Sequence, residues 1–326
     1  MLAGDRAASA QASFGKPAIV VQGGGMRGVY SMGALLAISE MPIAKEFRQA
    51  FGSSAGAMNA AFLLADQTAM AVSVYVDDIS NASFINPLRV RKMVDIDYLI
   101  DDVLTIRKPL DIAAVKAAQC TLHIALTDAY TGRVHYVTNH DTDIDLMEAL
   151  RATAAMPVLY NRLVHLGDGL YFDGGTVEPV PLIPAIAAGC NPIVVVITRP
   201  YPVSRARGGW GIRCAETLFL RSFPPATRHP VTGLETSFGS TLEAIEQARR
   251  SSGQPEIVLI HPDAEHFTVT RTTRSRSTLI RNAYLGWRDA RKAFGLATSQ
   301  ETFCALLEPY LPVTDVAKAI SAVPLA

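Results

Sequence analysis

The chain has 326 residues, 49% of them hydrophobic and 18% charged, which excludes a disordered protein and a chain too short to bury a core. The 30 basic and 30 acidic residues give no formal net charge, so no overall field favours nucleic acid or an acidic membrane as a partner. The four cysteines are far apart and form no CxxC pair, which argues against a zinc site, a redox motif or a disulfide framework and fits a reducing cytoplasm.

The first 16 residues (MLAGDRAASAQASFGK) contain no apolar stretch, so we expect no signal peptide. An uncharged span between Glu178 and Arg199 approaches the ~20 residues that a helix needs to cross a bilayer. Four prolines interrupt it, however, and it is better interpreted as a loop, a short helix at Leu182–Ala188 and a buried strand at Ile193–Thr198. We therefore expect a cytoplasmic protein.

Two successive units of strand, glycine turn and helix are predicted in the N-terminal region. Ala18–Gln22 is typical of a short buried strand, and the glycine-rich loop at 23–28 and an apolar helix follow it. Gln49–Phe51 is the second predicted strand, followed by the turn at 52–56 and an alanine-rich helix. Two such units indicate an α/β fold with a mostly parallel central sheet flanked by helices.

The later elements are predicted from turn residues and apolar runs. Residues Asp66–Ala118 indicate a mostly helical insertion, with Pro87 and Pro109 as breaks, that covers one end of the sheet. Further expected elements are a hairpin at Thr121–Val137, a helix at Asp145–Ala155, a hairpin at Leu163–Phe172, exposed loops at 205–210 and 221–230, a last strand at Glu256–His261 and a closing helix at Thr278–Phe294.

The loop at 23–28 (GGGMRG) has three interpretations. It matches the G-x-G-x-x-G dinucleotide fingerprint, but the expected ribose-binding acid is missing where the second strand ends, because Glu46 precedes that strand. An oxyanion hole is the second interpretation, since amides of glycines approach a developing alkoxide closely and the following helix start adds positive potential. A tight turn used only for packing is the third.

Residues 52–56 (GSSAG) fit the G-x-S-x-G elbow, in which a strand-to-helix turn exposes the central serine, here Ser54. The glycines allow the strained turn and let a substrate approach, while Ser53 in the variable position should point elsewhere. The alternative is a serine that only caps the following helix.

A serine nucleophile needs a base. The triad order of α/β-hydrolases would be satisfied by Asp173 followed by any of three histidines, His229, His261 or His266. Too few predicted strands precede Ser54 for that fold, and none of the histidines lies in a marked motif. The DGG segment at 173–175 instead places a partly desolvated carboxylate at a strand end, where it could accept the serine proton directly. An ordinary Asp-Gly turn is the alternative.

The motifs GGGMRG, GSSAG and DGG, in this order and spacing, resemble those of the patatin-like phospholipase family, whose members use a Ser–Asp dyad. The resemblance covers about residues 16–200 and includes 151–157 (RATAAMP), which is similar to the helix end and proline before the acid hairpin. It implies a three-layer α/β architecture with a catalytic core at 16–200, the helical insertion at about 66–118, and a C-terminal part at 201–326 that completes the same domain.

The resemblance also implies residue roles. Ser54 would be the nucleophile and Asp173 the base, and the oxyanion-hole loop would comprise Gly24, Gly25, Met26 and Arg27, with the Arg27 side chain bracing the loop. The motif-supporting glycines are Gly23, Gly28, Gly52, Gly56, Gly174 and Gly175. The implied activity is a serine hydrolase acting on fatty-acyl esters of (lyso)phospholipids or related lipids through an acyl-enzyme, with no metal and no cofactor.

Two alternatives stay open, a lipid-binding or regulatory protein with little activity and a nucleotide-binding protein that uses Gly23–Gly28. The expected partner is a lipid ester and not nucleic acid, and we expect the lining that selects the acyl chain to come from Asp66–Ala118. A basic run at Thr268–Lys292, with seven cations against Asp289 alone, indicates either a peripheral contact with anionic headgroups or a solvated helix face. The sequence indicates no oligomeric state.

Overall fold

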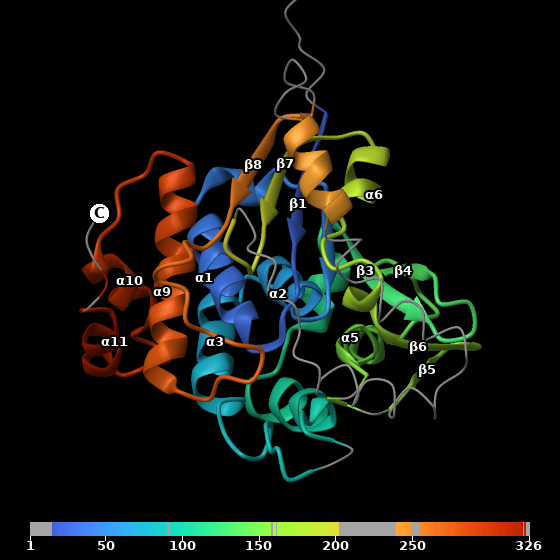
Figure 1. Ribbon diagram of the computed structural model, residues 1–326, viewed down its shortest axis with the longest axis horizontal. Coiled ribbons are helices and arrows are strands. Elements are labelled where there is room, and N and C mark those ends of the chain that lie inside the picture. Colours follow the sequence, from blue (N-terminus) through green and yellow to red (C-terminus); the bar gives the residue numbers. More distant parts are fainter. Residues whose placement is uncertain are drawn as a thin grey trace, which may run out of the picture.

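The computed structural model describes residues 15–89, 92–157, 159–160, 162–201, 239–248, 255–321 and 323. The loops expected at 205–210 and 221–230 lie outside these residues. An eight-stranded mixed sheet forms the centre of the described chain, as expected for an α/β fold (Figure 1).

The sheet has a parallel centre and an antiparallel edge. Its order is β5-β6-β3-β2-β1-β7-β8, with β4 paired to β3. The strands β3, β2, β1, β7 and β8 pair with one another in parallel. The strands β4, β5 and β6 are joined to this part of the sheet by antiparallel pairing. The bounds are β1 Lys16–Val21, β2 Gln49–Ser53, β3 Thr121–Asp128, β4 Val134–Thr138, β5 Val164–Leu166, β6 Gly169–Asp173, β7 Cys190–Val196 and β8 Ile257–Ile260.

Alternating side chains of the central strands enter two separate cores. In β1, Ile19 and Val21 face one core, whereas Ala18 and Val20 face the other. Successive side chains of a strand point to opposite faces, so a sheet covered on both sides needs apolar residues at every position. The apolar run AIVV meets that need, which explains why it forms a central strand.

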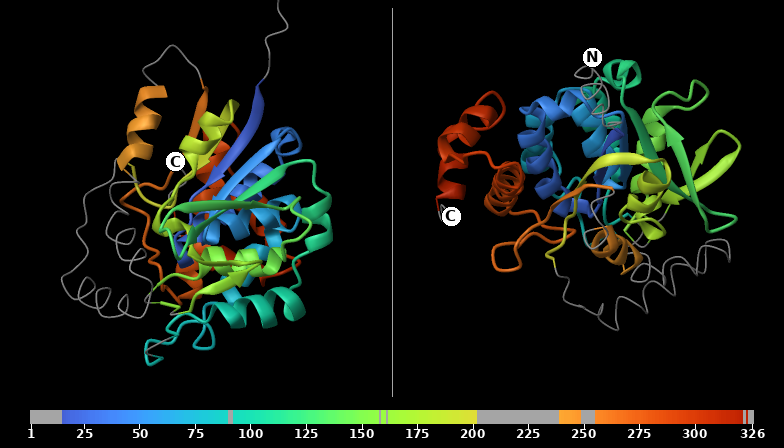
Figure 2. Two further views of the ribbon diagram at one scale, coloured as in Figure 1. Left: turned by 90° about the vertical axis from the view of Figure 1, so that its right-hand side faces the viewer. Right: turned by 90° about the horizontal axis from the view of Figure 1, so that it is seen from above.

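Helices cover both faces of the sheet and give the expected three layers. The larger core is formed with α1 (Gly28–Ser39), α2 (Ala55–Leu64), α3 (Thr68–Ser73), α5 (Leu146–Ala154) and α9 (Arg276–Ala293). The smaller core lies under α6 (Leu182–Ala187) and a helix at 239–248. Two further helices, α10 (Gln300–Leu307) and α11 (Val313–Ile320), lie outside α9, away from the sheet (Figure 2).

The segment between Asp66 and Ala118, where we expect a helical insertion, contains several helices. It contains α3, two π-helical segments, η3 (Val74–Asp78) and η4 (Tyr98–Arg107), and α4 (Ile112–Ala117). Elsewhere in the described chain there are short 3-10 helices at η1 (Gly25–Arg27), η2 (Pro42–Lys45) and η5 (Gly174–Thr176). In Figure 1 the insertion lies beyond the carboxyl ends of the parallel strands, which is the end of the sheet where β2 delivers Ser54.

The uncharged span before Arg199 forms α6 and β7, as expected from its prolines. No helix in the described ranges combines the length and the apolar character that crossing a bilayer requires.

Candidate active site

Ser54 lies on the turn that joins β2 to α2. Its backbone has φ 56° and ψ −133°, a left-handed conformation that is unusual for a residue other than glycine. Such strain persists only where the surrounding fold imposes it, and it is the geometry of a nucleophile elbow. Both serines are buried, Ser53 fully at the end of β2 and Ser54 with 6% of its surface exposed.

The side chains of Ser54 and Asp173 meet directly. The Ser54 hydroxyl donates a hydrogen bond of 2.9 Å to Oδ2 of Asp173, although the two residues are 119 positions apart. Asp173 ends β6, and its second carboxylate oxygen accepts the Gly175 N–H at 2.7 Å. The Thr127 hydroxyl on β3 donates to the Asp173 carbonyl at 2.8 Å and fixes the end of β6. The DGG segment therefore places the Asp173 carboxylate next to the Ser54 hydroxyl.

Burial is the main influence on the charge of this carboxylate. It raises the pKa of Asp173 to about 6, and the hydrogen bonds from Ser54 and Gly175 and the positive charge of Arg271 partly oppose the effect. The carboxylate is then largely ionised at neutral pH and more basic than an exposed one. In the described part of the chain, His261 and His266 bond to Pro262 and Asp263 instead of Ser54, and His229 lies outside it.

The glycine-rich loop packs against the serine turn. A Cβ on Gly23 would lie 2.7 Å from that of Ser54, and Gly24 and Gly25 have φ values of 153° and 58°, which favour glycine. The structure differs from expectation at the next two residues. The Met26 N–H donates to the Arg271 carbonyl at 3.1 Å, and the Arg27 N–H donates to Gly24 at 3.3 Å.

Two amides of the loop thus have protein partners, whereas the described residues provide no hydrogen-bond acceptor for those of Gly24 and Gly25. The Arg27 side chain braces the loop only through a long contact of 3.5 Å between Nε and the Gly24 carbonyl. The loop is also fixed from the segment that follows β7, because the hydroxyl of Thr198 donates to the Gly23 carbonyl at 2.6 Å.

A family model described as "Patatin-like phospholipase" matches residues 19–186 of the chain, which include all three motifs. The chain belongs to the patatin-like phospholipase family.

Individual relatives share about a quarter of their residues with this chain over the matched regions. The chain is 27% identical over 194 residues to the protein YjjU of Escherichia coli (strain K12), with 57% of this chain and 53% of that protein covered. It is 25% identical over 170 residues to human "Patatin-like phospholipase domain-containing protein 4", with 49% of this chain and 64% of the relative covered. The matches thus span between half and two thirds of the length of these relatives.

The fold is shared with VipD from Legionella pneumophila. The TM-score is 0.50 at 12% identity, and the superposition covers 95% of this chain and 80% of that one. This likeness supports the patatin-like architecture of the whole described chain.

Two pockets meet at Ser54 of this patatin-like protein. The first is polar, and its lining includes Gln22, Gly23, Gly24, Arg27, Asp173, Gly175, Arg199 and Arg271. The second is mainly apolar, and its lining includes Met58, Tyr75, Ile79, Phe84, Val94, Ile96, Leu99 and Leu159. Five of these eight residues come from the part of the Asp66–Ala118 insertion before η4, namely Tyr75, Ile79, Phe84, Val94 and Ile96. This insertion is where we expect the lining for the acyl chain. Ser54, Met156 and Arg271 line both pockets.

Thr153 is a contact of the serine that sequence reasoning missed. Its hydroxyl accepts the Ser54 N–H at 2.9 Å and donates to the Ala125 carbonyl at 2.6 Å. Thr153 is fully buried in α5, so this bridge ties the serine turn to α5 and β3 at once. The RATAAMP segment contains the residue, and its resemblance to the family was the one available signal.

The other glycines of the motifs surround this centre. Gly28 begins α1, Gly52 and Gly56 flank the serine turn in β2 and α2, and Gly174 and Gly175 form η5 directly after the carboxylate.

The basic run at Thr268–Lys292 does not form a single face. Arg271 lines both pockets, Arg276 pairs with Asp77, and Arg288 is buried beside Asp289. Arg291 lies over the ring of Trp287. Several of the seven cations therefore have internal roles, and peripheral membrane contact stays a prediction, as does the cytoplasmic location.

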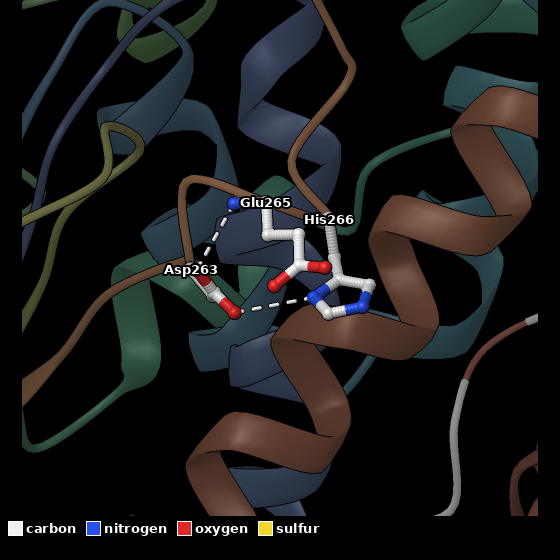
Figure 3. A group of neighbouring side chains, drawn as sticks. All are labelled: Asp263, Glu265 and His266. Carbon is white, nitrogen blue, oxygen red and sulfur yellow. Dashed lines mark hydrogen bonds and ion pairs between the residues drawn. The ribbon is translucent and has the colours of Figure 1, made fainter.

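A separate surface group has the spacing of metal ligands. Asp263, Glu265 and His266 follow β8, and their candidate ligand atoms lie within 4.8 Å of one another (Figure 3). Within the residues that the structure describes, His266 Nδ1 already pairs with Asp263 at 3.1 Å, and both acids are exposed. Exposed acidic groups at such spacing are common on protein surfaces, so we assign them no role.

Proposed function

We propose that this chain is a serine acyl hydrolase that cleaves fatty-acyl esters of (lyso)phospholipids or related lipids through a Ser54–Asp173 dyad. The observation that carries the proposal is the 2.9 Å hydrogen bond from the Ser54 hydroxyl to Asp173 at the point where a polar and an apolar pocket meet. A nucleophile, its base and space for both halves of a lipid ester are then in one place.

Asp173 acts as the general base in the first step. It accepts the proton from the Ser54 hydroxyl while the serine oxygen attacks the ester carbonyl carbon. Burial supports this role, because a carboxylate with a pKa of about 6 accepts a proton more readily than an exposed one. The same group then returns the proton to the departing alcohol oxygen, which leaves an acyl-serine ester.

The amides of Gly24 and Gly25 stabilise the negative charge that develops on the carbonyl oxygen. Within the described chain these two amides make no backbone hydrogen bond, and the positive φ of each glycine turns the loop tightly against the serine elbow. Fixed donors of this kind require no reorganisation during the reaction, and removing one typically costs about 10²–10³ in kcat.

The apolar pocket accommodates the acyl chain, and the polar pocket accommodates the alcohol side of the ester. In the second step a water molecule takes the place of the alcohol, Asp173 removes its proton, and attack on the acyl-serine releases the fatty acid. Ser54 recovers its proton from Asp173, so the cycle ends with the dyad unchanged.

Fatty-acid release from monoacylglycerol and lysophosphatidylcholine tests the proposal. We expect Ser54→Ala to abolish release and Asp173→Asn to reduce it by about 10²–10⁴-fold. Ser53→Ala is the matched control, because this neighbouring hydroxyl is buried and has no hydrogen-bond partner among the described residues. Activity that survives Asp173→Asn unchanged would exclude the dyad.

A further inference from the structure

The polar pocket beside Ser54 contains an excess of positive charge. Three guanidinium groups line it, from Arg27, Arg199 and Arg271, and Asp173 is the one carboxylate among the described lining residues. They come from distant parts of the chain, since Arg27 belongs to η1, Arg199 follows β7, and Arg271 lies between β8 and α9. Arg199 and Arg271 lie beyond residues 19–186 that the family model matches.

Arg271 is fixed in position by its main chain, while its side chain is available. Its carbonyl accepts the Met26 N–H at 3.1 Å, which places the residue against the glycine-rich loop. Within the described ranges its guanidinium has no hydrogen bond or ion pair with protein. Because Arg271 lines both pockets, it lies beside the boundary where the scissile ester would sit.

Among the described residues Arg27 has no carboxylate partner either, and its one side-chain hydrogen bond there is the 3.5 Å contact with Gly24. Burial, and then the like charges of Arg271 and Arg199, lower the pKa of Arg27 to about 9. The group is still cationic at neutral pH. Grouped, partly desolvated cations repel one another, and a bound anion would relieve that repulsion.

Asp173 does not account for these cations. Both of its oxygens already accept hydrogen bonds, from Ser54 and Gly175. Arg271 is the last of the influences on the pKa of Asp173, after burial and the two hydrogen bonds. Arg271 and Arg27 are therefore available to a group that the substrate brings into the pocket, and Arg199 adds its positive charge to the lining.

We propose that Arg271, together with Arg27 and Arg199, forms a phosphate subsite that makes the enzyme prefer ester lipids with a phosphate next to the scissile ester over neutral ones. With the acyl chain in the apolar pocket and the ester at Ser54, the adjoining alcohol substituent enters the polar pocket. The planar guanidinium fork matches two phosphate oxygens at once, and such charged pairs are about twice as strong as neutral hydrogen bonds. This inference rests on the proposed function for the orientation of the substrate.

Binding to the full-length Ser54→Ala protein tests the subsite without hydrolysis. The probes are 1-hexanoyl lysophosphatidate and 1-hexanoylglycerol, which differ only by the phosphate and are short enough to be studied as monomers by calorimetry. We expect the phosphate ester to bind at least about tenfold more tightly. The neutral ester lacks the hydrogen bonds between phosphate and guanidinium, and the loss of hydrogen bonds to a charged group weakens binding by about this factor. Arg271→Gln in the same background should reduce this preference several-fold, because Arg27 and Arg199 remain, and Arg271→Lys should give an intermediate value.

Lys292→Gln is the matched control, because it removes one positive charge from the exposed surface of α9 and should preserve the preference. Equal affinity of the Ser54→Ala protein for the two probes, or a preference that Arg271→Gln leaves unchanged, would overturn the subsite. Inorganic phosphate is the third probe, and binding as tight as that of lysophosphatidate would assign the arginines to free phosphate and overturn the lipid preference.

Hydrolysis by the protein with Ser54 intact separates the two proposals. If the phosphate preference in binding is present but neither ester is hydrolysed, the subsite stands and the proposed function is wrong. If 1-hexanoylglycerol is hydrolysed but the preference is absent, the proposed function stands and the subsite is wrong.

Discussion

The main-chain N–H of Met26 donates a hydrogen bond of 3.1 Å to the carbonyl oxygen of Arg271. This contact joins the glycine-rich loop after β1 to the connection between β8 and α9, two segments far apart in the chain. It also directs a candidate oxyanion-hole amide toward protein, so the neighbouring amides of Gly24 and Gly25 are the available donors. The position of the C-terminal segment therefore bears directly on the candidate active site.

Gly25→Ala should disable the loop. A Cβ at this position would lie 2.8 Å from the Arg271 carbonyl, and the backbone φ of 58° is unfavourable for alanine. Because the Gly25 amide would move, we expect a loss of about 10²-fold or more in kcat for ester hydrolysis. Steady-state kinetics with p-nitrophenyl butyrate provides the measurement.

Gly167→Ala is the control for backbone strain. Gly167 has a similar φ of 55°, lies between β5 and β6, and has open space where the Cβ would be. It should show the destabilisation caused by the strain while preserving kcat. Equal losses of kcat in both variants would show that the loop amides are not involved in the reaction.

Thr153→Val should misplace the nucleophile. The variant keeps the shape of the side chain but removes the acceptor of the Ser54 N–H and the donor to Ala125. Unsatisfied buried groups of this kind cost about 1–3 kcal/mol of unfolding free energy. We also expect kcat/KM to fall by about 10- to 100-fold, since small shifts of a reacting group have effects of this size.

Thr153→Ser restores the hydroxyl and should recover most of kcat/KM. Urea unfolding of both variants measures their stability. If valine and serine variants lose activity equally, packing by the threonine methyl matters and the hydrogen bond to Ser54 does not.

The pH profile of kcat/KM should follow the ionisation of Asp173. Only the ionised carboxylate can accept the serine proton, and burial raises its pKa from 3.8 to about 6. Activity should therefore fall by about tenfold per pH unit as the pH decreases below that value, well above the range of an exposed carboxylate. A profile that stays flat down to pH 4.5, measured with a neutral ester, would contradict a base with a raised pKa.

Ile96→Phe should shorten the preferred acyl chain. Ile96 lines the apolar pocket and is 5% exposed, so a larger ring at this position occupies space that the proposal assigns to the substrate. We expect the ratio of kcat/KM for palmitoyl over butyryl p-nitrophenyl esters to decrease several-fold, with about 1–3 kcal/mol of overpacking cost. Ile106→Phe, on an exposed position of η4, should leave the ratio unchanged.

The parts of the site that could be predicted from the sequence are those encoded within a few adjacent residues. GSSAG after an apolar strand specifies a tight turn that carries the serine, and DGG specifies a carboxylate at a strand end. Their local conformations follow from glycine positions and flanking strands, and the structure has both turns where they were expected. The alternating cores of β1 likewise follow from its continuous apolar run.

Contacts between distant segments could not be predicted in the same way. Thr153 and Ser54 are 99 positions apart, and the RATAAMP segment by itself does not show that its threonine contacts the serine turn. Arg271 occurs in a run that reads as a charged surface, yet the path of the chain after β8 turns it into the pocket. The π-helical character of η3 and η4 was also missed, because apolar periodicity indicates a helix without specifying its hydrogen-bond spacing.

Labelling with a fluorophosphonate probe followed by peptide mapping tests the central claim most directly, because such probes react with activated serines in folded protein. Our account predicts labelling at Ser54, no labelling of Ser54→Ala, normal labelling of Ser53→Ala and slow labelling of Asp173→Asn. Absence of labelling in the folded wild-type protein, or labelling at a residue other than Ser54, would contradict it.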